Sequence, residues 1–246
     1  MDGVTMNISN VKKSFQQMKW YEWVMAVIMI AIAGWSMISA FTGGSGGGSN
    51  PPWLTVVNFI SAVCGVFCIF FCASANISNF AFGLVNTLVY MIFLWYHKIY
   101  GTFGLELFIY LPFNIGGWIV WSRHRDQIQP EKTMVKKLST NEVLIVIGVV
   151  FFTAVVYHDI LVRLDGAVPW LDAFTVSIGV IATFLEMKRY REQYWLWVVQ
   201  DVIAVAMYIV HFDAVYLTKK SIYLIMAIIG VYRWHKLHRE RNIENV

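Results

Sequence analysis

Residues 194–212, YWLWVVQDVIAVAMYIVHF, form an apolar stretch that carries a glutamine and an aspartate in its middle. Hydrophobic residues make up 58% of the 246-residue chain and charged residues only 14%, whereas a soluble domain carries about 25% charged residues. Such a chain has too little polar surface to cover itself in water. We therefore expect lipid to be its solvent and this stretch to be a membrane-spanning helix.

Eight apolar segments of this kind follow one another along the chain. They lie at residues 22–41, 53–73, 79–96, 103–122, 142–162, 170–187, 194–211 and 219–235. Each is close to the roughly 20 residues that a helix needs to cross the hydrocarbon core, and helices satisfy their own backbone hydrogen bonds in lipid. The sequence therefore predicts an all-α integral membrane protein with about eight transmembrane helices. Lys219 and Lys220 edge the shortest segment and are expected to extend to the headgroups.

Basic residues indicate the orientation, because cytoplasmic loops are enriched in Lys and Arg. With eight spans and a cytoplasmic N-terminus, fifteen of the nineteen Lys and Arg side chains fall on the cytoplasmic side. Both termini are therefore expected in the cytoplasm. The same bias accounts for the net charge of +4 without a nucleic-acid partner.

Two sequence patterns recur in the two halves of the chain. Pro-Trp-Leu occurs at residues 52–54 and 169–171, and Y-x6-G-x3-W occurs at residues 110–121 and 223–234. Chance among many aromatic residues is the alternative explanation. A true repeat predicts two parallel three-helix units joined by a linking helix, a 3+1+3 arrangement with an extra N-terminal helix. Transporters built from such repeats bind substrate near mid-membrane, between repeats that rock to alternate access.

The predicted arrangement divides the chain into four parts. Residues 1–49 hold the extra helix and an outer loop, and residues 50–122 form the first three-helix repeat. Residues 123–168 provide a cytoplasmic loop and the linking helix, and residues 169–246 form the second repeat and a cytoplasmic tail. The Gly/Ser-rich residues 42–52 are interpreted as a flexible part of the outer loop.

Polar side chains within the spans are the candidates for function. Asp201 lies about 10 Å along its helix, and a charged residue at the centre of a span costs roughly 2.5 to 3.5 kcal/mol on insertion. Something must stabilise it, and both a functional site and an interhelical hydrogen bond are open explanations. Gln200 adjoins it, and Asn86 and Asn114 bring amides into other spans. Glu106 lies near a helix end, where we expect it to be solvated.

Aromatic residues share helix faces with these polar groups. Trp197 lies four residues before Asp201 and Tyr208 seven after it, while Asn86 and Tyr90 are four apart, so each set follows the helical period. Flat rings beside carboxylate and amide groups suit a planar ligand, including a cationic one. The predicted binding residues are Asn86, Tyr90, Asn114, Trp197, Gln200, Asp201, Tyr208 and Tyr223.

Other chemistry has little support in the sequence. It contains no H-E-x-x-H, G-x-S-x-G or Walker motif, so we expect no enzyme, no metal and no cofactor. Cys64, Cys68 and Cys72 form a helical stripe that favours packing over a soft-metal site. A membrane receptor or scaffold stays open as a function of another class.

The stretches YWLWVVQD, WIVWSRH and VYRWHK resemble the PnuC family of nicotinamide riboside transporters, and the resemblance covers about residues 50–236. It implies a multi-pass protein of the bacterial inner membrane with a fold similar in outline to that of SWEET transporters. It also implies facilitated diffusion of the unphosphorylated nucleoside, followed by trapping through a cytoplasmic kinase. A homo-oligomer, including a trimer, fits the same expectation.

The resemblance also suggests roles for the predicted residues. Trp197 and Tyr90 would face the pyridinium ring of nicotinamide riboside, and Asn86 and Gln200 would bond its carboxamide or ribose. Asp201 would accept from a hydroxyl or balance the cation. Related branches that transport thiamine or riboflavin are alternatives, as is proton symport through Asp201.

Overall fold

The computed structural model describes residues 8–42, 51–127, 129–163, 169–210 and 214–244. The chain folds into two compact units, Met1–Met134 and Val135–Val246. In the described part of the chain, extended pairing is limited to three isolated bridges. The prediction of an all-α protein is confirmed.

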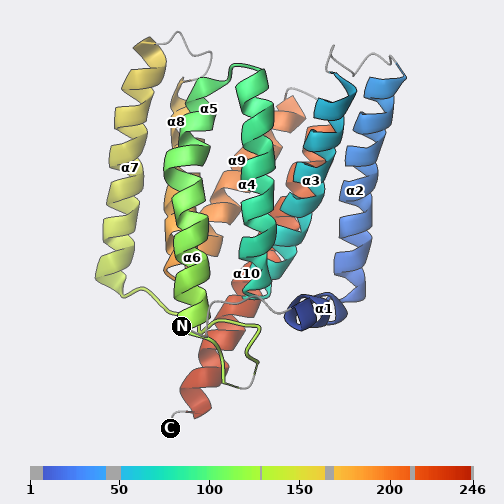
Figure 1. Cartoon of the computed structure of the whole chain (residues 1–246). Helices are drawn as coiled ribbons and strands as arrows, with labels where there is room; N and C mark the ends of the chain where they lie inside the picture. The colour runs from blue at the N-terminus through green and yellow to red at the C-terminus, as the bar shows by residue number, and fades with distance from the viewer. Residues whose placement is uncertain (1–7, 43–50, 128, 164–168, 211–213, 245–246) are drawn as a thin grey trace. The chain divides into compact units, whose positions relative to one another are not determined.

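Unit 1 contains a sequence of helices that pack on their neighbours. They are α1 (Ile8–Gln16), α2 (Trp20–Phe41), α3 (Pro52–Ala73), α4 (Ser78–Tyr96), α5 (Tyr100–Leu105), the π-helix η1 (Glu106–Tyr110) and α6 (Leu111–Arg123). Helix α2 packs on α3, α3 on α4, and α4 on α6 (Figure 1). Together α5, η1 and α6 form one apolar span, and Pro52 occupies the first turn of α3, where its missing N–H is no loss.

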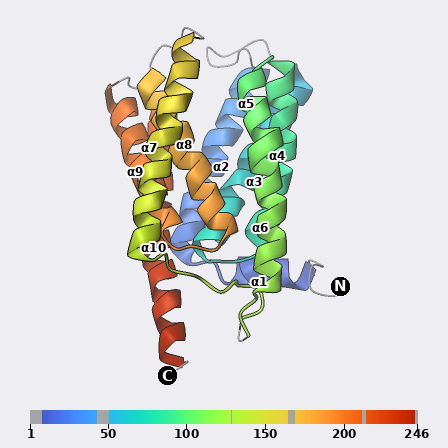
Figure 2. The same ribbon diagram turned by 90° about the vertical axis from the view of Figure 1, so that its left-hand side faces the viewer.

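In the part of unit 2 that the structure describes, there are four helices, and each packs on the next one along the chain. They are α7 (Thr140–Arg163), α8 (Pro169–Met187), α9 (Gln193–Val210) and α10 (Ala214–Glu244). Figure 2 shows α10 extending beyond the other helices of its unit toward the C-terminus. Its last turns are rich in charge, as expected of a helix that continues into water.

Seven of the eight predicted segments lie within described helices, and the segment 194–211 does so as far as Val210, the last described residue of α9. Among the described residues, six spans are long and apolar enough to cross a membrane: α2, α3, α4, the α5–α6 span, α7 and α8. Helix α7 leaves Leu144, Ile145 and Phe152 largely exposed, and such apolar surface suits contact with lipid rather than water. Because α9 and α10 fall outside the six, the number of eight spans stays a prediction. The predicted loop at residues 43–50 lies outside the described residues.

The Y-x6-G-x3-W pattern in unit 1 has a packing reason. A Cβ atom on Gly117 of α6 would overlap the ring of Phe80 on α4, so only glycine admits that ring. Phe80 packs edge-on against Trp121 with ring centroids 4.8 Å apart, and Trp121 is completely buried. The glycine and the tryptophan of the pattern therefore both contact the same ring, that of Phe80.

Unit 2 makes the same contact with the second copy of the pattern. A Cβ atom on Gly230 of α10 would overlap the ring of Tyr194 on α9. Tyr194 packs against the buried Trp234 at a centroid distance of 5.5 Å. The repeated sequence pattern thus accompanies a repeated contact, while the parallel 3+1+3 arrangement stays a prediction.

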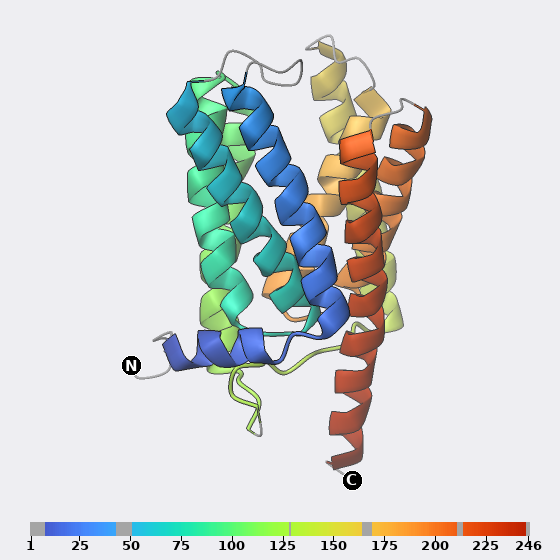
Figure 3. The same ribbon diagram turned by 90° about the vertical axis from the view of Figure 1, so that its right-hand side faces the viewer.

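Helix α1 was not predicted, and it docks on unit 1 through apolar contacts. Figure 3 shows α1 lying crosswise to α2 at one end of the unit. The ring of Phe15 packs edge-on against Phe67 and Phe71 of α3 and Phe82 of α4, at centroid distances of 5.0, 5.1 and 5.9 Å. Its nine residues contain no continuous apolar run, so they did not stand out beside the membrane-spanning segments.

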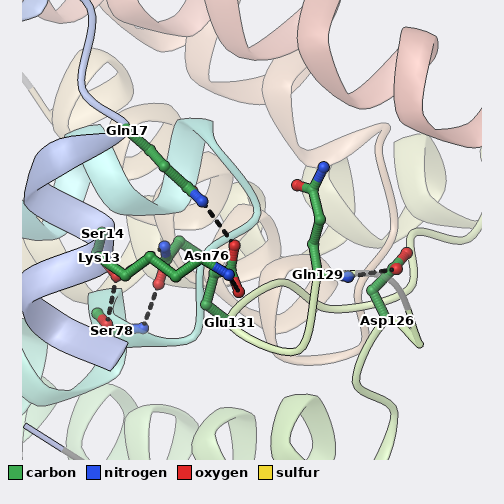
Figure 4. Close-up of polar contacts among 8 residues, drawn as sticks. All are labelled: Lys13, Ser14, Gln17, Asn76, Ser78, Asp126, Gln129 and Glu131. Atoms are coloured by element: carbon green, nitrogen blue, oxygen red, sulfur yellow. Dashed lines mark hydrogen bonds and ion pairs between the residues drawn. The ribbon is translucent and has the colours of Figure 1, made fainter. Parts of the chain in front are cut away.

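Hydrogen bonds from α1 and from Gln17, the residue after it, end on the α3–α4 turn and on the loop after α6 (Figure 4). Ser14 Oγ lies 3.1 Å from Ser78 Oγ and accepts from Asn76 Nδ2 at 2.8 Å. Lys13 Nζ and Gln17 Nε2 donate to the two carboxylate oxygens of Glu131, at 3.1 and 2.7 Å.

Glu131 is the charged residue at the centre of this docking site. Its burial raises the pKa of the carboxyl group, but hydrogen bonds from Gln17, from its own backbone and from Lys13 outweigh that effect, so the pKa is lowered. The loop is braced further by Gln129, whose backbone N–H donates to Asp126 Oδ1 at 3.0 Å. The ionised carboxylate therefore ties α1 to unit 1.

Candidate functional site

Asp201 is buried on α9 and forms an ion pair with a lysine of α10. Lys220 Nζ lies 3.2 Å from Asp201 Oδ1, with 23% of the lysine side chain and 5% of the aspartate side chain exposed. The cation that stabilises the buried carboxylate is therefore Lys220. The expectation that Lys220 extends to the headgroups was wrong, because its ammonium turns toward the carboxylate instead.

Other predicted residues of unit 2 surround this ion pair along α9 and α10. Gln200 precedes Asp201, and its Oε1 atom is buried with no hydrogen-bond partner among the residues that the structure describes. The ring of Tyr223 lies below the Lys220 ammonium, 5.3 Å from the ring centroid. Trp197 and Tyr208 are half-buried on α9. We call these five predicted residues and Lys220 the α9–α10 cluster.

In unit 1, the amide of Asn86 faces helix α3. Asn86 Oδ1 accepts a hydrogen bond of 2.7 Å from Ser61 Oγ. A Cβ atom on Gly65 of α3 would lie 3.5 Å from that oxygen, so the glycine allows close approach of the two helices. One turn further along α4, the ring of Tyr90 stacks on Phe93 with centroids 6.0 Å apart.

Asn114 and Glu106 face α4 from the neighbouring span. Asn114 Nδ2 donates to the Tyr110 carbonyl at 3.1 Å, and a Cβ atom on Gly83 would lie only 2.5 Å from Asn114 Oδ1. The Glu106 carboxylate accepts a hydrogen bond from the Thr87 hydroxyl. Glu106 is therefore not simply solvated at a helix end, and that expectation is corrected. We call Ser61, Asn86, Thr87, Tyr90, Glu106 and Asn114 the α3–α6 cluster.

The eight predicted residues therefore fall into two clusters, three in unit 1 and five in unit 2. Sequence reasoning missed Ser61, Thr87 and Lys220, which are the hydrogen-bond or charge partners of Asn86, Glu106 and Asp201. One signal for them was available in the sequence. Thr87 follows Asn86 just as Asp201 follows Gln200. Asn86 lies six residues after Phe80 on α4, and Gln200 lies six residues after Tyr194 on α9.

The chemistry of the two clusters favours binding over catalysis. Carboxylate, amide and hydroxyl groups lie beside aromatic rings within apolar helices, as in sites that orient a small polar ligand. Intramembrane ionisable groups commonly mark a substrate or ion pathway.

The model of a known protein family matches most of the chain. That family is described as "Nicotinamide mononucleotide transporter", and the match covers residues 55–236. The nicotinamide riboside transporter PnuC of Neisseria mucosa is 30% identical over 198 residues, which cover 76% of this chain and 74% of the relative. The PnuC protein of Haemophilus influenzae is 28% identical over 191 residues, covering 77% and 82%.

A solved structure agrees with these sequence matches. A crystal structure of the vitamin B3 transporter PnuC superposes with a TM-score of 0.72 and 26% identity, covering 96% of this chain and 99% of that one. These relatives are transporters rather than enzymes, as expected. The buried charges in apolar helices, the fold and the relatives together establish that this chain is a multi-pass membrane protein of the PnuC transporter family.

Proposed function

We propose that this chain carries nicotinamide riboside across the bacterial inner membrane by facilitated diffusion. The observation that carries the proposal is the pair of polar clusters within apolar helices of a PnuC-type fold. The PnuC relatives are named for nicotinamide riboside, which has a cationic pyridinium ring, a carboxamide and ribose hydroxyls. Rings, amides and carboxylates are the groups that such a ligand requires.

The charges of the clusters favour the riboside over the mononucleotide. A phosphate group needs Arg, Lys or backbone N–H donors to replace its hydration. Among the residues of the two clusters, Lys220 is the one cation, and Asp201 already neutralises it. The mononucleotide would therefore bring two negative charges without a matching partner.

Each predicted side chain has a role in this proposal. In unit 2, Trp197 faces the pyridinium ring and Gln200 bonds the carboxamide or the ribose. In unit 1, Tyr90 and Asn86 are given the same two roles. Gln200 Oε1 supports this role because it is buried, has no hydrogen-bond partner in the described part of the chain and can accept a bond from the ligand. Asp201 accepts from a ribose hydroxyl, and Asn114, Tyr208 and Tyr223 complete the set.

Uniport and kinase trapping belong to the same proposal. Asp201 is already paired with Lys220, so the pair can stay charged through the cycle without carrying a proton. A cytoplasmic kinase then phosphorylates the nucleoside and prevents its return. Both termini lie in the cytoplasm, and a homo-oligomer such as a trimer is the assembled form.

A titration experiment tests the substrate. Purified protein is titrated calorimetrically with nicotinamide riboside, the mononucleotide, thiamine and riboflavin, and binding of the riboside alone is expected. Asn86→Ala and Gln200→Ala should each weaken riboside binding roughly 5- to 10-fold, the range of one neutral hydrogen bond. Asn141→Ala, an exposed amide on α7, is the matched control. Preference for another ligand would contradict the proposed substrate. Unchanged affinity in both variants would show that Asn86 and Gln200 do not bind it.

A further inference from the structure

A second carboxylate lies within the spans and has no role in the proposed function so far. Glu106 is the first residue of η1, in the span that leads from α5 to α6. Its carboxylate accepts a hydrogen bond from Thr87 of α4, and Thr87 is buried. Glu106 itself is half-buried, so part of its side chain stays accessible to a ligand.

The π-helix that begins at Glu106 has a local cause in the sequence. Pro112 has no N–H to donate and its ring crowds the preceding turn, which disturbs the α-helical bonding before it. The Leu111 N–H bonds to the Glu106 carbonyl, five residues back, so the turn holds one more residue than an α-helical turn. Such π turns occur frequently at functional sites.

Glu106 occupies the position in unit 1 that Lys220 occupies in unit 2. Thr87 lies seven residues after Phe80, and Asp201 lies seven residues after Tyr194, the two rings that make the repeated glycine contact. Glu106 precedes Tyr110 by four residues and Lys220 precedes Tyr223 by three, and the extra residue of the π turn accounts for the difference.

The two corresponding contacts differ in their charge balance. In unit 2, Asp201 is paired with Lys220 at 3.2 Å, so the contact is neutral overall. In unit 1, the contact joins a carboxylate to a hydroxyl, and in the described part of the chain no Lys, Arg or His forms an ion pair with Glu106. An unpaired carboxylate inside a span favours a cation as its partner.

We propose that Glu106 is the residue that pairs with the positive charge of the transported molecule, with Thr87 as its positioning residue. The inference deepens the proposed function and rests on it: the cation is the pyridinium of nicotinamide riboside. Asn114 lies on the same α4–α6 interface as Glu106, because Gly83 and Thr87 share one face of α4. The Asn114 amide and the Glu106 carboxylate thus act on one ligand.

A pair of ligands with matching shape and different charge tests this inference. Nicotinamide riboside is cationic, whereas its reduced dihydropyridine form has nearly the same shape and a neutral ring. Glu106→Gln keeps the size of the side chain and a group that can bond Thr87. It should lower affinity for the cationic form at least about tenfold and leave the reduced form within about twofold. Glu142→Gln, at the exposed start of α7, is the control.

The outcomes separate this inference from the proposed function. If the unmodified protein does not bind nicotinamide riboside, the proposed function fails. If it binds and Glu106→Gln binds the cationic form equally well, or loses both forms to the same extent, the assignment of Glu106 is overturned. A melting temperature within about 2 °C of the unmodified protein shows that the variant is folded.

Discussion

Replacing Lys220 by methionine should destabilise the protein through the carboxylate that it leaves behind. The Asp201 side chain is only 5% exposed and its ion-pair partner is Lys220. Removing one member of a buried pair typically costs about 3 to 5 kcal/mol, because the remaining charge is left uncompensated. Asp201 can limit this loss by taking up a proton, but protonating an ordinary aspartate at pH 7 costs about 4 kcal/mol. We therefore expect a loss of about 3 to 4 kcal/mol.

Thermal unfolding of the purified protein measures this effect. For a chain of this length a change of 1 kcal/mol shifts the melting temperature by about 2 to 4 °C, so Lys220→Met should melt roughly 10 °C lower. The double variant Asp201→Asn/Lys220→Met removes both charges and should recover most of that difference. Lys219→Met, one residue away and exposed, is the matched control. Equal melting temperatures for the two single lysine variants would refute the reasoning.

Three further predictions concern other parts of the fold. Glu131→Gln should speed hydrogen exchange of the α1 backbone. Because the pKa of Glu131 is lowered in the folded protein, the stabilisation by its carboxylate is present above about pH 5 and is lost as the pH falls through the folded pKa. The melting temperatures of the variant and the unmodified protein should therefore converge in acid, and a pH-independent difference between them would contradict this. Gly230→Ala should lower the free energy of unfolding by about 1 to 3 kcal/mol, measured by denaturant titration, because the added Cβ overlaps the Tyr194 ring; full stability would show that the ring can move aside. Pro112→Ala should restore regular α-helical bonding, and a crystal structure that still contains the π turn at Glu106–Tyr110 would show that proline is not its cause.

The sequence predicted the positions of the helices because the apolar segments are long and their ends carry clear signals. Pro52 and Pro169 mark the starts of α3 and α8, and charged or polar residues separate the segments. Helix α1 was missed because its role depends on tertiary contacts, such as those of Phe15 with α3 and α4. The Gly117 and Gly230 contacts explain why the repeated pattern was readable without a structure.

The candidate site was predictable only in part. The apolar surroundings of Asp201 showed that it needs a partner, but the identity of that partner depends on the packing of α9 against α10. Lys220 lies at the edge of an apolar segment, where a long side chain can reach either the headgroups or a buried acid. Glu106 was misjudged for a similar reason: distance from a helix end does not reveal the hydrogen bond to Thr87.

Uptake of labelled nicotinamide riboside into vesicles that contain the purified protein tests the central claim most directly. With no ion gradient, the account predicts saturable uptake that stops when the inner and outer concentrations are equal, and rapid exchange when unlabelled riboside is present inside. No uptake above protein-free vesicles would contradict transport of this substrate. Accumulation beyond the outer concentration on imposing a pH gradient, with the membrane potential clamped at zero, would contradict facilitated diffusion and favour proton symport.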